Sequence, residues 1–327
     1  MAFFVCVTEM SARPNFPATQ TECRWAIGTV LGEVVCDDGV MSSGAELVDS
    51  VEGALDVGVA ARRPLSGGDV AASFRLELSD GRTVFAKTHH APRPHFFETE
   101  AAGLAWLRQA VPETIPEVLA VGDGFLVLSW IDEGRPGPDT DAQLGRLLAT
   151  LHRSGAPCFG RQDRRTTGSR GLPNDTFDTW AEAYAANRLL PLARLGADTG
   201  GLHDSTVRRL EGLAGRLDEL EVPIEPPARL HGDLWAGNRL VDVDGRNWLI
   251  DPAAHGGHRE FDLAMMLLFG GFSQMCFRAY DEQSPLAAGW EQRVPLHQLA
   301  PLAVHAIKFG GSYEAATVRA LDAVDEL

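Results

Sequence analysis

The chain has 327 residues, of which 45% are hydrophobic and 23% charged, the composition of an ordinary folded protein. At this length a single hydrophobic core is usually divided, so two lobes are expected. Acidic residues outnumber basic ones by 45 to 29, and the net charge of −16 opposes binding to nucleic acid or to an anionic membrane surface. No apolar run approaches the roughly 18 residues that are needed to span a bilayer.

The cysteine pattern indicates a reducing compartment. The five cysteines are odd in number, widely spaced and without a C-x-x-C pair. The apolar residues 1–7 lack a positively charged start, so a secretory signal is not expected. The predicted location is therefore the cytoplasm.

Residues 1–43 mix proline, glycine, cysteine and polar residues without helical or strand periodicity. This pattern predicts a disordered extension, and Met41 is an alternative candidate for the first residue of the native product. The first stretch with sustained helical composition covers residues 45–59.

Residues 44–131 are expected to form a small α+β lobe. Alternating apolar residues predict strands at 73–78 and 83–88, joined by a hairpin turn at Asp80-Gly81. An apolar face predicts a helix over 96–109, which Pro112 ends. Further strands are expected at residues 64–65, 117–121 and 125–130.

Residues 132–327 are expected to form a larger and mainly helical lobe. The Pro- and Gly-rich segment 131–138 reads as the link between the lobes. Four leucines at helical spacing predict a helix that Asp139 or Thr140 caps. Later helices are predicted at 177–192, 203–220, 260–268, 291–309 and 313–324. One β hairpin, 239–243 with 247–250, is predicted around Asp244-Gly245.

The chemically most informative segment precedes and follows this hairpin. It reads H-G-D-L-W-A-G-N at residues 231–238 and I-D-P at 250–252. Phosphoryl transfer requires a carboxylate that accepts the proton of the attacking hydroxyl, and oxygen ligands that hold Mg²⁺ on the phosphates of ATP. Asp233, Asn238 and Asp251 supply this set with the order and spacing of a kinase catalytic loop.

An isolated D-x-x-x-x-N would more simply be a turn. Here three elements follow one another in the expected order, with a predicted hairpin between them. The combination therefore favours a kinase over a turn.

Lys87 ends an apolar strand of the first lobe, and Glu98 and Glu100 lie on the next predicted helix. A buried ammonium requires a partner, and a helical glutamate would orient it toward the nucleotide phosphates. Glu100 is preferred because it lies nearer the inward face of the helix.

Other candidate positions rest on weaker signals. Gly67 and Gly68 could form a loop over the phosphates, although a plain turn explains them equally well. Ser129, Trp130 and Ile131 lie where an adenine-binding hinge is expected. The histidines show no spacing typical of zinc sites, and His152 and His258 are expected to make structural hydrogen bonds.

Together these segments resemble the fructosamine kinase family, over nearly everything from about residue 48 to the C-terminus. Tryptophan directly after H-G-D-L distinguishes this family from aminoglycoside and choline kinases. The matching segments are L-H-G-D-L-W-A-G-N (230–238), I-D-P-A (250–253), G-H-R-E (257–260), D-L-A-M (262–265), L-F-G-G-F (268–272) and F-G-G-S-Y (309–313).

The resemblance implies a bilobal protein-kinase-like fold and ATP-dependent phosphorylation of the 3-hydroxyl of ketosamines, with release of the amine as a repair of glycation. It implies that Asp233 is the base, that Asn238 and Asp251 hold Mg²⁺, and that Lys87 with Glu100 positions the nucleotide. Trp235 would border the sugar, and His231 is the second candidate for substrate contact.

The chain departs from the family pattern at two places. His255-Gly256 stands where many members carry aromatic residues, which bears on the width of the substrate pocket. Residues 65–72 lack the cysteine through which some members form a disulfide-linked dimer, so a monomer is expected. A kinase for aminoglycoside-like or other hydroxyl compounds, and a nucleotide-binding pseudokinase, are the alternative hypotheses.

Overall fold

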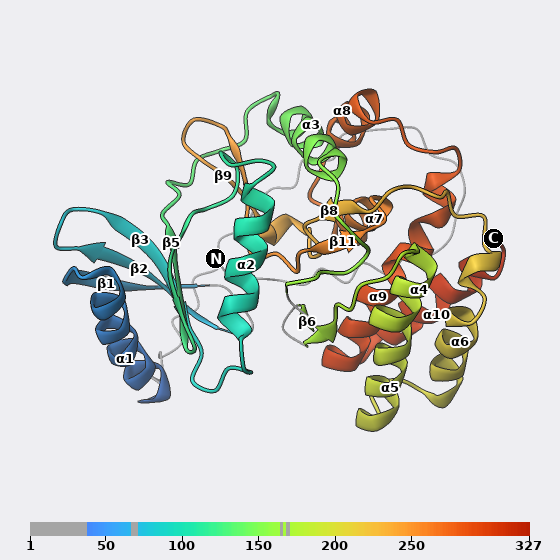
Figure 1. The fold of residues 1–327 in the computed structure, drawn as a ribbon, viewed down its shortest axis with the longest axis horizontal. Helices are drawn as coiled ribbons and strands as arrows, with labels where there is room; N and C mark the ends of the chain where they lie inside the picture. The colour runs from blue at the N-terminus through green and yellow to red at the C-terminus, as the bar shows by residue number, and fades with distance from the viewer. Residues whose placement is uncertain (1–37, 67–70, 164–165, 168–170) are drawn as a thin grey trace, which may run out of the picture.

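The computed structural model describes residues 38–66, 71–163, 166–167 and 171–327, with side chains omitted for 38–43 and 166–167. A β-rich lobe and a larger helical lobe lie side by side, with helix α2 between the first sheet and the helices of the larger lobe (Figure 1). The predicted α+β, bilobal architecture is confirmed. No helix among these residues combines the length and the apolar character needed to cross a membrane.

The first lobe is built on an antiparallel sheet of five strands in the order β1-β2-β3-β5-β4. Strand β2 alternates between partly exposed and buried positions, and Leu47 and Val51 of helix α1 pack against the sheet to close a small core. The elements are α1 (Asp38–Leu55), β1 (Val59–Leu65), β2 (Ala72–Leu78), β3 (Thr83–Thr88), β4 (Val118–Gly122) and β5 (Phe125–Ser129).

Helix α2 (Phe96–Arg108) joins the two lobes. Phe97, Leu104 and Leu107 are fully buried in a cluster that also contains residues of α3, α7 and α8 in the second lobe. The predicted helix 96–109 is therefore present, and its apolar face contributes to the core that the lobes share.

The second lobe consists mainly of helices. Its helices are α3 (Thr140–Arg153), α4 (Trp180–Tyr184), a π-helical turn (Ala185–Leu189), α5 (Leu190–Thr199), α6 (Asp204–Ala214), α7 (Glu260–Phe269), α8 (Gln274–Gln283), α9 (Trp290–Phe309) and α10 (Ser312–Val324), with 3₁₀ turns at Leu217–Glu219 and Ala236–Asn238. Helices α9 and α10 pack closely, and α7 lies against α9.

Three short antiparallel strand pairs complete this lobe. Strands β9 (Arg239–Val241) and β10 (Asn247–Leu249) form the predicted hairpin. Strand β8 (Ala228–Leu230), just before the H-G-D segment, pairs with β11 (His255–Gly257), and β6 (Thr166–Thr167) pairs with β7 (Leu172–Pro173). The β8–β11 pair was not predicted because, unlike β9 and β10, its short strands are far apart in the sequence and no turn signal joins them directly.

Several boundaries differ from expectation. Helix α1 begins at Asp38, upstream of the predicted boundary at residue 44, while residues 1–37 lie outside the described part. The single helix predicted over 177–192 is instead three segments that continue to Thr199, and α8 was not predicted although Cys276, Phe277 and Tyr280 form a buried face. Asp139 occupies the N-cap position of α3 but makes no side-chain capping hydrogen bond, and the Thr140 hydroxyl accepts from the N–H of Gly137, which precedes the helix, at 2.8 Å.

Close packing of α3 on α8 generates a test of the core. A Cβ at Gly145 would lie 2.0 Å from the Cys276 carbonyl oxygen and 2.9 Å from the Tyr280 nitrogen. We expect Gly145→Ala to lower the free energy of unfolding by about 2 kcal/mol, because the helices must move apart. Denaturant unfolding measures the change.

The matched control is Gly212→Ala in α6, where a Cβ would meet nothing within 4 Å. This exchange should stabilise the protein by about 0.5–1 kcal/mol, since alanine is the better helix former. Equal effects of the two substitutions would contradict the packing described for α3 and α8.

Candidate active site

The segment 231–238 forms a loop between β8 and β9, and the path of this loop requires a glycine at position 232. Gly232 has a φ of 80°, and a Cβ there would lie 2.2 Å from the Ala253 carbonyl oxygen. A larger residue is therefore excluded at this position. The glycine brings the loop against the chain that follows Asp251.

Asp262, on the first turn of α7, holds the start of this loop. Its carboxylate oxygens accept hydrogen bonds from the backbone N–H groups of His231 (2.7 Å) and Gly232 (2.9 Å). His152 Nε2 lies 3.1 Å from the same carboxylate, and its Nδ1 lies 2.9 Å from the Tyr280 hydroxyl. The side chains of His231, His152, Asp262 and Tyr280 are all buried. Sequence reasoning assigned no function to Asp262, although it lies in the D-L-A-M segment.

His231 lies inside the loop. Its side chain is fully buried, its Nε2 lies 2.9 Å from the Ile250 carbonyl oxygen, and its Nδ1 lies 3.3 Å from the backbone nitrogen of Asp233. Burial lowers the pKa of His231, so the ring is neutral near pH 7. The Nε2–H then donates to Ile250, and the ring joins the loop to the segment that carries Asp251.

Asp233 and Asn238 face each other across the loop. The amide nitrogen of Asn238 donates to the carbonyl oxygen of Asp233 at 2.8 Å and lies 3.3 Å from its carboxylate and 3.4 Å from the Asp251 carbonyl oxygen. Burial and the nearby charge of Asp251 raise the pKa of Asp233 to about 7. A carboxyl group with such a pKa can gain and lose a proton under physiological conditions.

Asp251 connects this loop to the first lobe. The Lys87 ammonium lies 2.8 Å from the Asp251 carboxylate and 2.5 Å from that of Glu100 on α2. Glu98, the alternative partner, contacts His95 instead. Strand β3, helix α2 and the segment after β10 therefore meet at one ammonium group.

The ionisation of this group follows from burial and charge. Burial would lower the pKa of Lys87, but Glu100 and Asp251 outweigh it and hold that pKa above its ordinary value. Burial raises the pKa of Glu100 to about 7 despite the neighbouring ammonium. For Asp251, burial raises the pKa but the contact with Lys87 lowers it by a larger amount, so the pKa lies below its ordinary value. Asp251 therefore remains an anion at neutral pH.

The donor chemistry at Asn238 and Asp251 fits Mg²⁺. The Asn238 amide nitrogen donates to Asp233, which orients the side chain, and its amide oxygen is the acceptor of that group. The Asp251 side chain is 45% exposed although its neighbour Lys87 is only 8% exposed, so the carboxylate is accessible. Carboxylate and amide oxygens are hard ligands of the kind that Mg²⁺ prefers.

The remaining predicted positions have different surroundings. The Trp235 ring is partly buried and lies 6.4 Å from that of Phe269. At the expected hinge, the Ser129 N–H donates to the Glu117 carbonyl oxygen, and the Trp130 indole N–H donates to Asp132. Ile131 follows directly and is partly buried. Gly67 and Gly68 lie outside the described residues.

Comparison with known proteins agrees with this geometry. A family model described as fructosamine kinase matches residues 44–326. A Synechocystis protein assigned as a ketoamine kinase is 35% identical over 262 residues, which cover 77% of this chain and 86% of that protein. The chloroplastic protein-ribulosamine 3-kinase of Arabidopsis thaliana is 30% identical over 254 residues, which cover 75% of this chain and 76% of that protein.

A solved structure extends the likeness to three dimensions. A Thermobifida fusca protein assigned as a fructosamine-3-kinase has a TM-score of 0.80 and 39% identity, with 86% of this chain and 99% of that chain covered. The predicted protein-kinase-like fold and the predicted family are both confirmed. The chain belongs to the fructosamine kinase family.

Proposed function

We propose that this protein is an ATP- and Mg²⁺-dependent kinase that phosphorylates the 3-hydroxyl of ketosamines, as a step in removing sugar adducts from amines. The observation that carries the proposal is the convergence of Asp233, Asn238, Asp251 and Lys87 on one site in a member of this family. The names of the Synechocystis and Arabidopsis relatives support the substrate class.

Asp233 acts as the base in this proposal. Its carboxylate orients the sugar hydroxyl and accepts its proton as the oxygen attacks the γ-phosphorus of ATP. The Asn238 amide holds the carboxylate in place through the 3.3 Å contact. Trp235 offers an aromatic face and an indole N–H beside the base, which suits the ring or chain of a sugar.

Lys87 positions the nucleotide phosphates, with Glu100 as the group that orients it. Asn238 and Asp251 would hold Mg²⁺, which neutralises charge on the phosphates when bound. Gly67 and Gly68 are proposed to cover the phosphates, and Ser129, Trp130 and Ile131 to contact the adenine. For His231, full burial and bonding to Ile250 favour a role in shaping the loop over contact with the substrate.

The proposal extends to the location and the oligomeric state of the protein. A net charge of −16 and an odd number of widely spaced cysteines without a C-x-x-C pair support a monomer that acts in the cytoplasm without nucleic acid. A ketosamine is cationic at its amine, which suits an acidic protein surface.

Removal of the base is the first test. We expect Asp233→Asn to reduce kcat about a thousandfold, because the sugar hydroxyl loses its proton acceptor, while MgATP affinity changes little. ADP release with a synthetic ribulosamine or fructosamine as acceptor measures kcat, and a thermal-shift titration measures nucleotide binding.

The matched control is Asp244→Asn, an exposed acid at the β9–β10 turn, which should retain full kcat. A kcat for Asp233→Asn within tenfold of wild type would remove Asp233 from the base role. Turnover of amino alcohols or aminoglycosides but not of ketosamines would contradict the substrate class and leave the mechanism intact.

The raised pKa of Asp233 predicts a pH dependence. The carboxylate must be deprotonated to act, so kcat/KM for the sugar should fall by roughly tenfold per pH unit below the pKa of this group. The acidic limb of the pH profile should have its midpoint near the Asp233 pKa of about 7, or somewhat lower when Mg²⁺ is bound beside this carboxylate. Initial rates at saturating MgATP across the pH range give the profile.

The limb should be absent from the residual activity of Asp233→Asn. A wild-type profile that stays flat down to about pH 5, near the ordinary carboxyl range, would show that the environment does not raise this pKa.

A further inference from the structure

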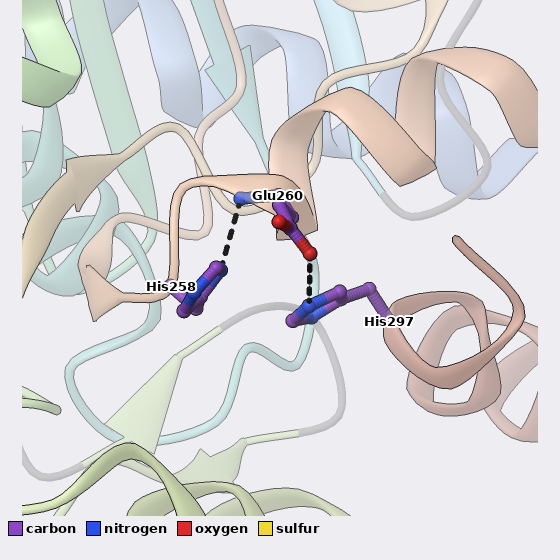
Figure 2. A group of neighbouring side chains, drawn as sticks. All are labelled: His258, Glu260 and His297. Atoms are coloured by element: carbon purple, nitrogen blue, oxygen red, sulfur yellow. Dashed lines mark hydrogen bonds and ion pairs between the residues drawn. The ribbon is translucent and has the colours of Figure 1, made fainter. Parts of the chain in front are cut away.

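A second group of metal-binding side chains lies where α7 begins against α9, separate from the Asp233 and Asp251 set. His258 and Glu260 flank the start of α7, and His297 projects toward them from α9 (Figure 2). One ligand atom from each residue lies within 4.8 Å of those of the others. All three residues are buried, with exposures of 2%, 1% and 0%.

Several nitrogens of this group lack partners. Within the described ranges, His258 Nε2 and both ring nitrogens of His297 are buried and make no hydrogen bond. His297 Nε2 is 3.4 Å from the Glu260 carboxylate, a contact too long for a good hydrogen bond. A buried polar atom without a partner lowers stability, so an ion bound to one of the His297 nitrogens would stabilise the fold.

We propose that His258, Glu260 and His297 bind one divalent transition-metal ion, with Zn²⁺ as the best chemical match. Two imidazoles and a carboxylate suit Zn²⁺ and are a poor set for Mg²⁺ or Ca²⁺, which prefer oxygen ligands. Zn²⁺ ligands at about 2.0–2.1 Å in a tetrahedron lie about 3.4 Å apart. The His297 nitrogen and the Glu260 oxygen already have this separation.

Outer residues support the same assignment. Arg293 holds the Glu260 carboxylate with two contacts, at 2.6 and 3.0 Å, and so fixes its orientation. Glu225 lies 3.9 Å from His258 Nε2. A carboxylate behind the non-coordinating nitrogen is the usual support of a metal-bound histidine, so His258 would bind through Nδ1.

His258 Nδ1 now faces the backbone N–H of Glu260 at 3.3 Å, a weak contact that an ion can replace. Because Arg293 shares the Glu260 carboxylate, we expect weaker affinity than that of a site with unshared ligands.

The ion would have a structural role. It would join the first turn of α7 to α9 beside the buried Glu260–Arg293 pair. Asp262, which holds the catalytic loop, lies one half-turn further along α7. The same ion would thus stabilise the element on which the loop depends without touching the reacting groups.

The test uses the full chain after metal removal with a chelator. Zn²⁺ is titrated in excess Mg²⁺, which occupies oxygen-rich sites, and bound zinc is measured by equilibrium dialysis with elemental analysis. We expect saturation at about one equivalent per chain and a higher melting temperature with zinc. Co²⁺ in place of Zn²⁺ should give the intense visible absorption of a four-coordinate site.

His297→Gln and His258→Gln should each weaken zinc binding by at least about tenfold and remove the gain in melting temperature. His305→Gln, on the same helix α9, is the matched control and should bind as the wild type does. If the wild-type protein binds much less than one equivalent of Zn²⁺ per chain, the proposal is overturned, whatever the variants do. Unchanged binding by both ligand variants would also overturn it. Neither readout depends on kinase activity.

Discussion

The arrangement of the active site depends on a buried ammonium that two carboxylates share. Lys87 joins Glu100 of α2 to Asp251 of the second lobe across 164 positions of sequence. An unpaired charge at such a position would cost several kcal/mol, so the three elements are held together by the need to compensate it. The same contact keeps Asp251 ionised, and burial together with this anion raises the pKa of Asp233. The ion pairs of Lys87 with Glu100 and Asp251 thus hold the two lobes together and also influence the pKa of Asp233.

A second set of contacts, behind the reacting groups, determines the path of the catalytic loop. Asp262 binds two successive backbone N–H groups of the loop, and His152 with Tyr280 orients its carboxylate. His231 adds a bond to the segment before Asp251. These residues are buried and joined by hydrogen bonds, which suits the placement of a base within a few tenths of an ångström. The proposed zinc site lies on the same first turn of α7 and would extend this support to α9.

Features that lie close together in sequence were predictable. The base, the metal ligands and the hairpin between them fall within about 20 residues with a spacing that the chemistry requires, and the face of α2 favoured Glu100 over Glu98. Contacts between distant segments were not. The bond from Lys87 to Asp251, the binding of the loop by Asp262 and the meeting of His258 with His297 depend on tertiary packing that no local pattern encodes. The β8–β11 pair was missed because its three-residue strands carry little periodicity and no turn signal joins them directly.

The identity of the phosphorylated product tests the central claim most directly. Wild-type protein is mixed with MgATP and a ribulosamine or fructosamine of a simple amine, and the product is examined by phosphorus–proton correlation NMR. A single phosphomonoester whose phosphorus couples to the proton on C3 of the sugar is the predicted result. A phosphate on another hydroxyl, or ADP formation without any sugar phosphate, would contradict the account.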